Sequence, residues 1–326
     1  MSALATTSAG PGRILALAGG VGGARLANGL VRHLEPDALT IVVNTGDDFE
    51  LHGLHIAPDL DTVVYTLAGL NDAARGWGMA GETWAMMGAL RRLGAEDWFA
   101  LGDQDVATHV LRTERLKTQT LSEVTTGLCS RLGVRHRVVP MSDDPVRTVV
   151  VTEEGRLAFQ EYFVRRRCAP RFIGVDFRGA SSAQPSAGFL AALNDPALAA
   201  IVICPSNPLL SIRPITSLPT IAERLAQRRV PVIAVSPFIG NQAVKGPAAK
   251  ILREIGLAPT PAGLIACYGE LLDALVIDHA DAGSAVPGGR VQMHVTDTLM
   301  RDTADQARLA AEVLAFAGRL SGPDVR

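Results

Sequence analysis

The stretch that most constrains the fold is a short apolar run that ends in paired glycines. Residues 14–18 (ILALA) precede GGVGG at 19–23, and apolar residues then recur at helical spacing as far as Val31. This pattern predicts a buried strand, a tight turn and a helix. Glycines let a backbone come close to a ligand, and the first N–H groups of a helix attract anions. The stretch is therefore a candidate phosphate seat, to which Arg25 adds a positive charge.

The glycine spacing does not match either common nucleotide motif. It reads G-G-x-G-G-A-R, whereas the dinucleotide fingerprint requires G-x-G-x-x-G and the P-loop ends in Gly-Lys-Ser/Thr. Taken alone, such a turn is also compatible with tight strand-to-helix packing and no ligand. An NAD-linked dehydrogenase is disfavoured, because no acidic residue follows the second predicted strand in the ribose-binding context.

A second strand is predicted over 39–43, and it ends in the polar turn NTGDD at 44–48. The carboxyl ends of neighbouring parallel strands form one ligand crevice, so we expect this turn and the glycine turn to face the same cavity. Carboxylates crowded beside a phosphate seat favour a hard divalent cation such as Mg²⁺. The candidates are Asp47, Asp48, Asp59 and Asp61. The alternative is that Asp59 or Asp61 only caps the helix that begins there.

Composition and charge narrow the class of protein. The 326-residue chain has a formal net charge of −2 and no long basic run, which disfavours nucleic acid as a partner. Its four cysteines are scattered, as expected of reduced thiols in a cytoplasmic protein. Residues 1–12 are predicted to be a disordered tail, and no later segment has about 18 uninterrupted apolar residues, the length that a membrane span needs.

The rest of the chain, 13–326, is predicted to be one α/β domain with a Rossmann-like, mostly parallel sheet and helices on both faces. Apolar runs over 199–204, 230–235, 275–278 and 291–295 predict further strands, and a closing helix is expected over 302–320.

Two segments interrupt this alternation. Residues 63–135 are predicted to be a mainly helical insert, with helix from 67 to 101. All three tryptophans lie in that stretch and suit either core packing or a flat aromatic ligand. Residues 147–165 are predicted to contain a β-hairpin whose second strand covers 157–164.

Several linked segments together resemble the 2-phospho-L-lactate transferase family of coenzyme F-420 biosynthesis, in its bacterial, phosphoenolpyruvate-type form. The resemblance runs from about Arg13 to the C-terminal helix. The segments that carry it are AGGVGGARLANGL, VVNTGDDFELHGLHIAPDLDTVVYTLAGL, RGWGMAGETW, WFALGDQDVATHVLRTERL, the SNP turn at 206–208 and SPFIGNQAVKG.

This resemblance implies a transferase. Members of the family take a lactyl, enolpyruvyl or glyceryl acid activated by guanosine diphosphate and transfer the phosphate-bearing acid to the primary hydroxyl of the deazaflavin Fo (7,8-didemethyl-8-hydroxy-5-deazariboflavin). They release GMP and require Mg²⁺. The resemblance also implies a homodimer. The competing hypothesis is a nucleotide-binding regulatory protein on the same scaffold that catalyses no reaction.

Carried over residue by residue, the resemblance also names a site. The diphosphate would be cradled by Gly20, Gly22 and Gly23, and the guanosine side would be lined by Ser206, Asn207 and Lys245. Catalysis is assigned to Asp48 and Asp61, and the metal to Asp47, Asp48, Asp59 and Asp61. Further substrate contacts are expected from Asn44, Asp48, Trp77, Asp103 and His109, although a lone histidine in such a segment is more often structural.

Overall fold

The computed structural model describes residues 12–284 and 288–320, so residues 1–11 of the predicted tail lie outside the described residues. Its main sheet contains the strands β1 (Arg13–Ala18), β2 (Leu39–Val43), β5 (Arg137–Pro140), β9 (Leu198–Ile203), β10 (Val232–Val235), β13 (Ala274–Asp278) and β14 (Gln292–Thr296). The strand order is β14-β13-β10-β9-β1-β2-β5, and each neighbouring pair is parallel. The predicted parallel sheet is confirmed.

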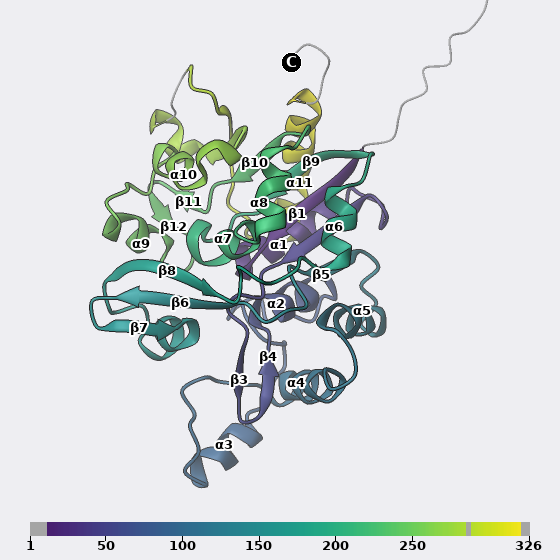
Figure 1. Ribbon diagram of the computed structural model, residues 1–326, viewed down its shortest axis with the longest axis vertical. Helices are drawn as coiled ribbons and strands as arrows, with labels where there is room; N and C mark the ends of the chain where they lie inside the picture. Colours follow the sequence, from purple (N-terminus) through teal and green to yellow (C-terminus); the bar gives the residue numbers. More distant parts are fainter. Residues whose placement is uncertain (1–11, 285–287, 321–326) are drawn as a thin grey trace, which may run out of the picture.

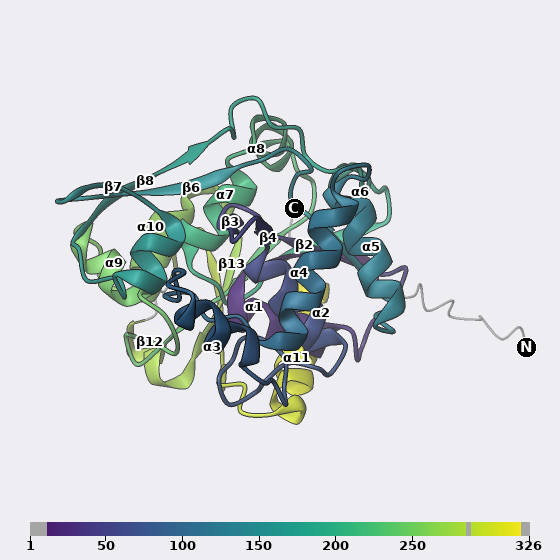
Figure 2. The same cartoon turned by 90° about the horizontal axis from the view of Figure 1, so that it is seen from below.

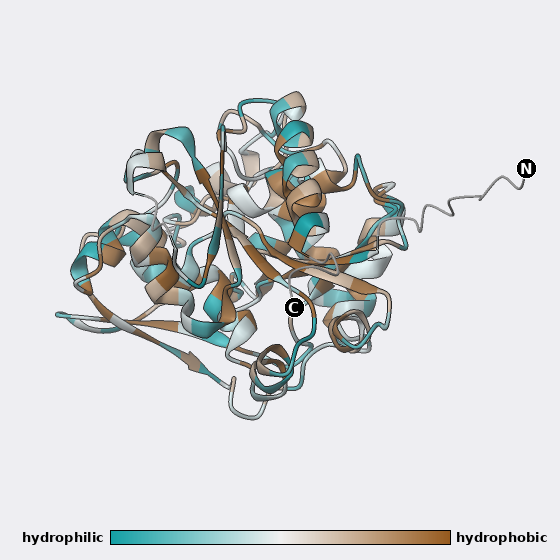
Figure 3. Ribbon diagram, turned by 90° about the horizontal axis from the view of Figure 1, so that it is seen from above, coloured by the Kyte–Doolittle hydropathy of each residue, from teal (hydrophilic) through white to brown (hydrophobic). Residues whose placement is uncertain are grey.

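Helices cover both faces of this sheet (Figure 1). Along β1, Ile14 and Ala16 belong to one apolar core and Leu15 and Leu17 to another, as the two-residue period of a strand requires. The first core holds α1 (Gly20–Leu30), α2 (Pro58–Leu67), α5 (Leu121–Arg131) and α11 (Thr303–Leu320). The second holds α6 (Ala187–Leu193), α7 (Arg213–Thr216), α8 (Pro219–Ala226), α9 (Ala248–Glu254) and α10 (Pro261–Tyr268). Figure 3 shows the apolar residues concentrated between these layers.

The segment between α2 and α5 is less helical than the sequence analysis predicted. It contains α3 (Ala85–Arg92) and α4 (Asp103–Arg115), but residues 68–84 form turns and an isolated bridge between Asn71 and Met79. The expectation of a helix over 67–101 was therefore wrong. The reason is the backbone of four glycines with positive φ, which a helix does not tolerate: Gly69, Gly76, Gly78 and Gly81.

The hairpin expected at 147–165 is present, and a third strand extends it into a small sheet. Its strands are β6 (Arg147–Thr152), β7 (Gly155–Ala158) and β8 (Phe172–Arg178), paired antiparallel in the order β7-β6-β8 (Figure 2). The strand expected over 157–164 ends at Ala158, and a π-helical turn, η1 (Glu161–Arg165), follows. Alternation stops there because Phe159 and Tyr162 both enter one small core beside Leu210.

The remaining elements are short. Two antiparallel hairpins consist of β3 (Phe49–Leu51) with β4 (Leu54–Ile56) and of β11 (Phe238–Ile239) with β12 (Gln242–Ala243). Single turns are η2 (Pro208–Ile212), η3 (Gly269–Leu271) and η4 (His279–Ser284). Across 12–284 and 288–320, every helix is too short or too polar to traverse a lipid bilayer.

The contact between α1 and α11 provides a test of the packing. A Cβ on Gly29 would lie 2.1 Å from the backbone oxygen of Gln306, whereas a Cβ on Gly318 of α11 would meet open space. We expect Gly29→Ala to lower the free energy of unfolding by about 2–3 kcal/mol, because backbone atoms cannot move aside. Gly318→Ala, the control, is expected to be neutral or stabilising by up to about 1 kcal/mol. Urea unfolding compares them, and equal effects would contradict the packing.

Candidate active site

A cavity lies where the order of the sheet reverses, at β1. From there β2 and β5 extend to one side and β9, β10, β13 and β14 to the other. In open parallel sheets this switch point, at the carboxyl ends of the strands, is where ligands bind. The cavity has a volume of about 480 Å³, and the turns after β1, β9 and β10 all line it.

The glycine turn after β1 is joined to the turn after β9. The Ser206 hydroxyl donates to the Gly19 carbonyl oxygen at 2.8 Å and accepts from the Gly19 N–H at 3.3 Å. Gly20 has φ +63°, which favours glycine. A Cβ on Gly22 would lie 2.2 Å from the Pro205 carbonyl oxygen, and a Cβ on Gly23 would lie 2.9 Å from the Ser206 hydroxyl. Gly22 and Gly23 are thus required for close packing of α1 on this turn.

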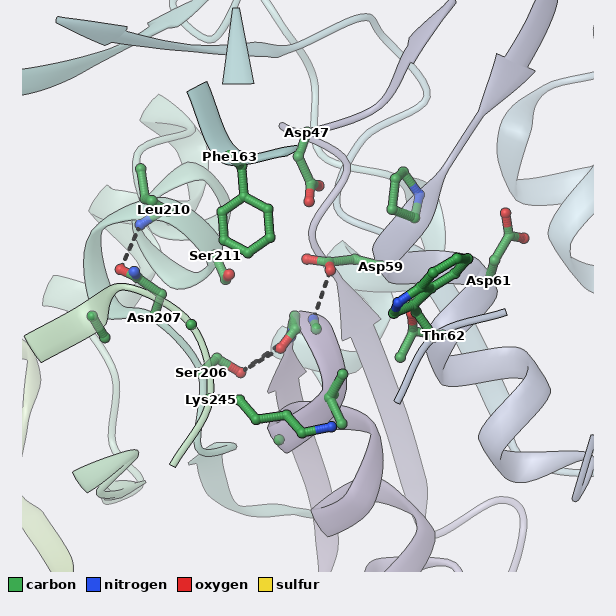
Figure 4. A pocket seen from close by; sticks show the side chains of 18 of the residues that line it. Asp47, Asp59, Asp61, Thr62, Phe163, Ser206, Asn207, Leu210, Ser211 and Lys245 are labelled. Atoms are coloured by element: carbon green, nitrogen blue, oxygen red, sulfur yellow. Dashed lines mark hydrogen bonds between the residues drawn. The ribbon is translucent and has the colours of Figure 1, made fainter. Parts of the chain in front are cut away.

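Asp59 and Asp47 stand together beside the glycine turn (Figure 4). Asp59 accepts from the Gly20 N–H at 2.7 Å, an interaction with the positive end of α1. The Asn44 side-chain amide donates to Asp47 at 2.8 Å and to Asp59 at 3.0 Å, so one group bridges both carboxylates. The Asn44 side chain is fully buried behind them and is not among the cavity-lining residues, which include both aspartates.

Burial makes both of these carboxylates costly to ionise. It raises the pKa of Asp59 to about 6, against the opposing hydrogen bonds from Asn44 and Gly20. Burial also raises the pKa of Asp47 well above its ordinary value, and the negative charges of Asp59 and Asp48 raise it further. Two carboxylates in this situation are stabilised by a nearby cation.

The other two predicted metal ligands face different partners. Asp48 is buried and lies 3.2 Å from the His55 ring; its second oxygen, Oδ1, has no hydrogen-bond partner among the described residues. Asp61 forms a two-point ion pair with the Arg112 guanidinium. The sequence therefore predicted one cluster of four carboxylates, whereas the structure has a pair, Asp47 with Asp59, and two aspartates with basic partners.

The helix-capping alternative is also resolved by the geometry. The residue at the N-cap of α2 is Ala57, which has no capping side chain, and Pro58 occupies the first turn. Asp59 and Asp61 follow within the helix, and their carboxylates bond to other elements. Neither is an N-cap.

One further group has metal-ligand spacing. Ligand atoms of Asp61, Asp105 and His109 lie within 4.8 Å of one another, and within the described parts of the chain no other set of three or more such residues does so. However, Arg112 already pairs with Asp61, and its Nη1 lies 3.3 Å from Nδ1 of His109. A guanidinium therefore neutralises this group, and the geometry disfavours a metal ion there.

Aromatic rings form the apolar part of the cavity. Trp77, Trp98 and Phe99 line it as expected from the tryptophan-rich segment, but Trp84 is not among the lining residues. Two further rings that line the cavity belong to Phe159, just before η1, and Phe163 within it. Their ring centroids lie 5.2 Å apart and the rings are stacked. The sequence analysis missed these two residues, because it placed them in a regular strand of the hairpin.

Gln160 was missed for the same reason. Its side chain is 5% exposed, lines the cavity and donates to the Asp47 carbonyl oxygen at 3.1 Å. The segment Phe159-Gln160-Glu161 offers no signal that would have identified it. Gln160 connects the aromatic wall to the turn that bears Asp47.

The remaining predicted residues divide between cavity and scaffold. Asn207 and Lys245 line the cavity. The side-chain oxygen of Asn207, Oδ1, accepts from the Leu209 and Leu210 N–H groups, while its buried Nδ2 has no partner in the described structure. Burial and the nearby Arg25 charge lower the pKa of Lys245. His109, 1% exposed, lies at the cavity wall.

Asp103 has a role in the scaffold. Its carboxylate accepts from the Ala85 N–H at 2.9 Å, the Met86 N–H at 3.0 Å and the Thr83 hydroxyl, and it is not among the residues that line the cavity. These bonds satisfy donors at the start of α3, as a capping residue does. The contact of Asp103 with substrate stays a prediction.

Comparison with known proteins defines the family. Residues 14–314 match the family model described as 2-phospho-L-lactate transferase CofD. The chain belongs to this family. It is 41% identical to a phosphoenolpyruvate transferase of Kitasatospora aureofaciens, over 94% of this chain and 98% of that protein. It is also 41% identical to a 2-phospho-L-lactate transferase of Methanopyrus kandleri, over 95% and 99% of the two chains. The resemblance seen in the sequence is confirmed.

A solved structure supports the fold. A protein of the UPF0052 family from Bacillus halodurans superposes with a TM-score of 0.60, covering 93% of this chain and 99% of that one at 14% sequence identity. At this identity the likeness concerns the fold alone, and it agrees with the α/β class predicted from the sequence.

The pKa of Asp59 leads to a pH-dependent prediction. Between about pH 4 and pH 6 the folded protein retains a proton on Asp59 that the unfolded chain releases, so this group stabilises the fold at low pH and loses that effect as the pH rises through about 6. Relative to Asp59→Asn, the wild type should therefore lose about 2–3 kcal/mol of unfolding free energy between about pH 4 and pH 7. Urea unfolding in EDTA measures the difference. The exposed control, Asp176→Asn, should show no such trend.

Proposed function

We propose that this protein transfers a phosphate-bearing three-carbon acid from a GDP-activated donor to the deazaflavin Fo and releases GMP, as a step of coenzyme F-420 biosynthesis. The observation that carries the proposal is the pair of buried carboxylates, Asp47 and Asp59, between a glycine turn and an aromatic slot within one cavity. A protein that only binds a nucleotide has no need of the aromatic slot.

The nucleotide diphosphate is assigned to the glycine turn. The first N–H groups of α1 lack intrahelical partners and favour an anion. In Figure 4 Lys245 extends across the start of this helix, where its ammonium group reaches a phosphate oxygen. The unpartnered Nδ2 of Asn207, at the opposite side of the turn, is a donor for a further oxygen of the donor substrate. Gly20, Ser206, Asn207 and Lys245 thus form the nucleotide side.

The residues present fit a magnesium ion. Asp47 and Asp59 supply two carboxylates that repel each other, and burial raises the pKa of both. Mg²⁺ is commonly bound by one or two carboxylates together with phosphate oxygens of the substrate and water. When bound, the ion supplies positive charge to the diphosphate. We assign it to Asp47 and Asp59, with Asp48 and Asp61 held behind by His55 and Arg112.

The acceptor is assigned to the apolar slot. Trp98 and Phe99 approach from one segment and Phe159 and Phe163 from another, and a flat tricyclic ring requires such walls. Gln160 fixes the position of this wall relative to Asp47 through its 3.1 Å bond to the Asp47 carbonyl oxygen. The terminal hydroxyl of Fo then points toward the carboxylate pair.

The chain's own residues contribute mainly alignment. The hydroxyl oxygen of Fo forms a bond to the β-phosphorus, the bond from that phosphorus to the bridging oxygen of GMP breaks, and the hydroxyl proton leaves. Such a transfer depends on positioning and on neutralising charge at phosphoryl oxygens. Lys245 and the α1 N–H groups hold the diphosphate and the rings orient the acceptor, while the hydroxyl proton passes to water because Asp59 is assigned to the metal.

The identity of the three-carbon acid needs a direct assay, because relatives of both names are equally similar at 41%. We expect the protein, supplied with Fo, Mg²⁺ and the lactyl, enolpyruvyl and glyceryl donors in separate reactions, to yield the corresponding Fo adduct and GMP by mass spectrometry. Absence of product with all three donors would refute the proposed transfer. Size-exclusion chromatography of the same sample tests the predicted homodimer.

The carboxylate pair is tested by substitution. Asp47→Asn and Asp59→Asn are each expected to lower kcat at least 100-fold, because one anionic ligand disappears, and EDTA should abolish turnover of the wild type. Asp97→Asn, at an exposed ion pair with Arg91, is the control and should keep wild-type turnover. Full activity of either variant in EDTA would show that the metal assignment is wrong.

The aromatic slot is tested by the Michaelis constant for Fo. Phe163→Leu and Trp98→Leu are expected to raise the KM for Fo about 10-fold and to leave the KM for the donor unchanged, because each removes ring contact worth roughly 1–2 kcal/mol. Ile173→Ala on β8, at a side chain 52% exposed, serves as the control. An equal rise in both Michaelis constants would place the acceptor elsewhere.

A further inference from the structure

A buried arginine lies behind the carboxylates, in a part of the protein that the proposed reaction does not use directly. Arg112 is 2% exposed and is among the largest fully buried side chains of the described structure. Burying a guanidinium is unfavourable unless its charge is paired and its N–H groups are bonded. Arg112 meets this condition through three different elements: α2, β4 and its own helix, α4.

The contacts of Arg112 join these elements at one point. Its two terminal nitrogens pair with both oxygens of Asp61 on α2, with Nη1 to Oδ2 at 3.1 Å. Nη1 also donates to the His55 carbonyl oxygen of β4 at 3.3 Å, and the His55 ring lies 3.2 Å from Asp48. The guanidinium therefore fixes α2, whose first turn bears Asp59, against the hairpin that follows Asp48.

The third contact specifies the protonation of His109. Nη1 of Arg112 lies 3.3 Å from Nδ1 of His109. An arginine has donors only, so Nδ1 is the acceptor in this contact, sharing the two hydrogens of Nη1 with Asp61 and the His55 carbonyl oxygen, and the ring proton is then on Nε2. Nε2 then lies 3.4 Å from Oδ1 of Asp105 without a hydrogen-bond partner among the described residues, and Asp105 accepts from the Tyr65 hydroxyl at 2.7 Å.

We propose that Arg112 is the positioning residue of this site: it holds Asp61 and β4 in register with the Asp47–Asp59 pair and keeps His109 neutral, with its proton on Nε2. The effect of Arg112 on catalysis rests on the proposed function, whereas its hydrogen bond to His109 does not. Partners that orient metal-binding or catalytic groups typically contribute 10- to 100-fold to activity when removed.

A lysine cannot replace this arginine. The planar guanidinium presents donors in a fixed fork that matches both oxygens of Asp61 and still reaches Nδ1 of His109 and the His55 carbonyl oxygen. An ammonium ion is a single point of charge on a flexible stem. Arg112→Lys therefore preserves charge and loses the geometry, which separates positioning from simple neutralisation of Asp61.

The first measurement reads the tautomer of His109 without any substrate. Protein labelled with ¹⁵N-histidine is examined by long-range ¹H–¹⁵N correlation at pH 7.5, and the His109 signals are identified by their absence in His109→Gln. We expect a neutral ring with its proton on Nε2 in the wild type, and a different protonation pattern in Arg112→Met. A wild-type ring protonated on Nδ1 or on both nitrogens would overturn the proposal.

The second measurement is kinetic. Arg112→Lys is expected to lower kcat 10- to 100-fold while the KM values for donor and acceptor change less than about twofold, because Arg112 contacts neither substrate. Arg115→Lys on the same helix is the matched control and should retain wild-type kcat. Wild-type kcat in Arg112→Lys, or a loss confined to KM, would overturn the positioning role even if Arg112→Met fails to fold.

The two proposals fail in different ways. If no donor gives a product, the proposed function is refuted, and the tautomer of His109 still tests the hydrogen bond from Arg112. If transfer occurs and His109 carries its proton on Nδ1, the positioning proposal is refuted and the function stands.

Discussion

The contact on which the site depends is the one between the Asp59 carboxylate and the first N–H of α1. The positive end of a helix attracts an anion, and here a side chain from α2 supplies it at 2.7 Å. Burial opposes this attraction strongly enough to raise the pKa of Asp59 to about 6, with Asp47 close by through Asn44. The fold thus places two carboxylates beside the turn to which the diphosphate of the proposed reaction is assigned, and the proposed cation would offset their repulsion.

The parallel sheet makes this contact possible. Reversal of strand order at β1 leaves the turns after β1 and β9 side by side, and Ser206 locks them with two hydrogen bonds to Gly19. Gly22 lets the Pro205 carbonyl oxygen approach α1 within the space a Cβ would fill. Packing between the two turns therefore explains why position 22 is a glycine, and the positive φ of Gly20 explains why position 20 is one.

Local pattern was enough to predict the strands of the main sheet, the glycine turn and the edge where polar turns gather, because these are marked by short continuous apolar runs that end in turn residues. It did not separate the aspartates, since spacing along the chain does not say which way a side chain points: Asp59 faces Gly20, whereas Asp61, two residues on, faces Arg112. It also missed Phe159 and Gln160, because the expected strand gives way to a π-helical turn that depends on contacts with the distant Leu210.

In the proposed transfer, the choice of three-carbon acid depends on small chemical differences between the candidate acids. Lactyl and enolpyruvyl groups differ by little more than hydrogen atoms and shape, and packing alone discriminates such differences by roughly 10- to 200-fold. A glyceryl group adds a hydroxyl, and a site built to bind a hydroxyl rejects analogues without it by a factor on the order of 10⁴. The buried, unpartnered Nδ2 of Asn207 is a donor for which an oxygen of the substrate is the natural partner. In the proposed reaction, preference between the first two acids is therefore expected to be graded rather than absolute.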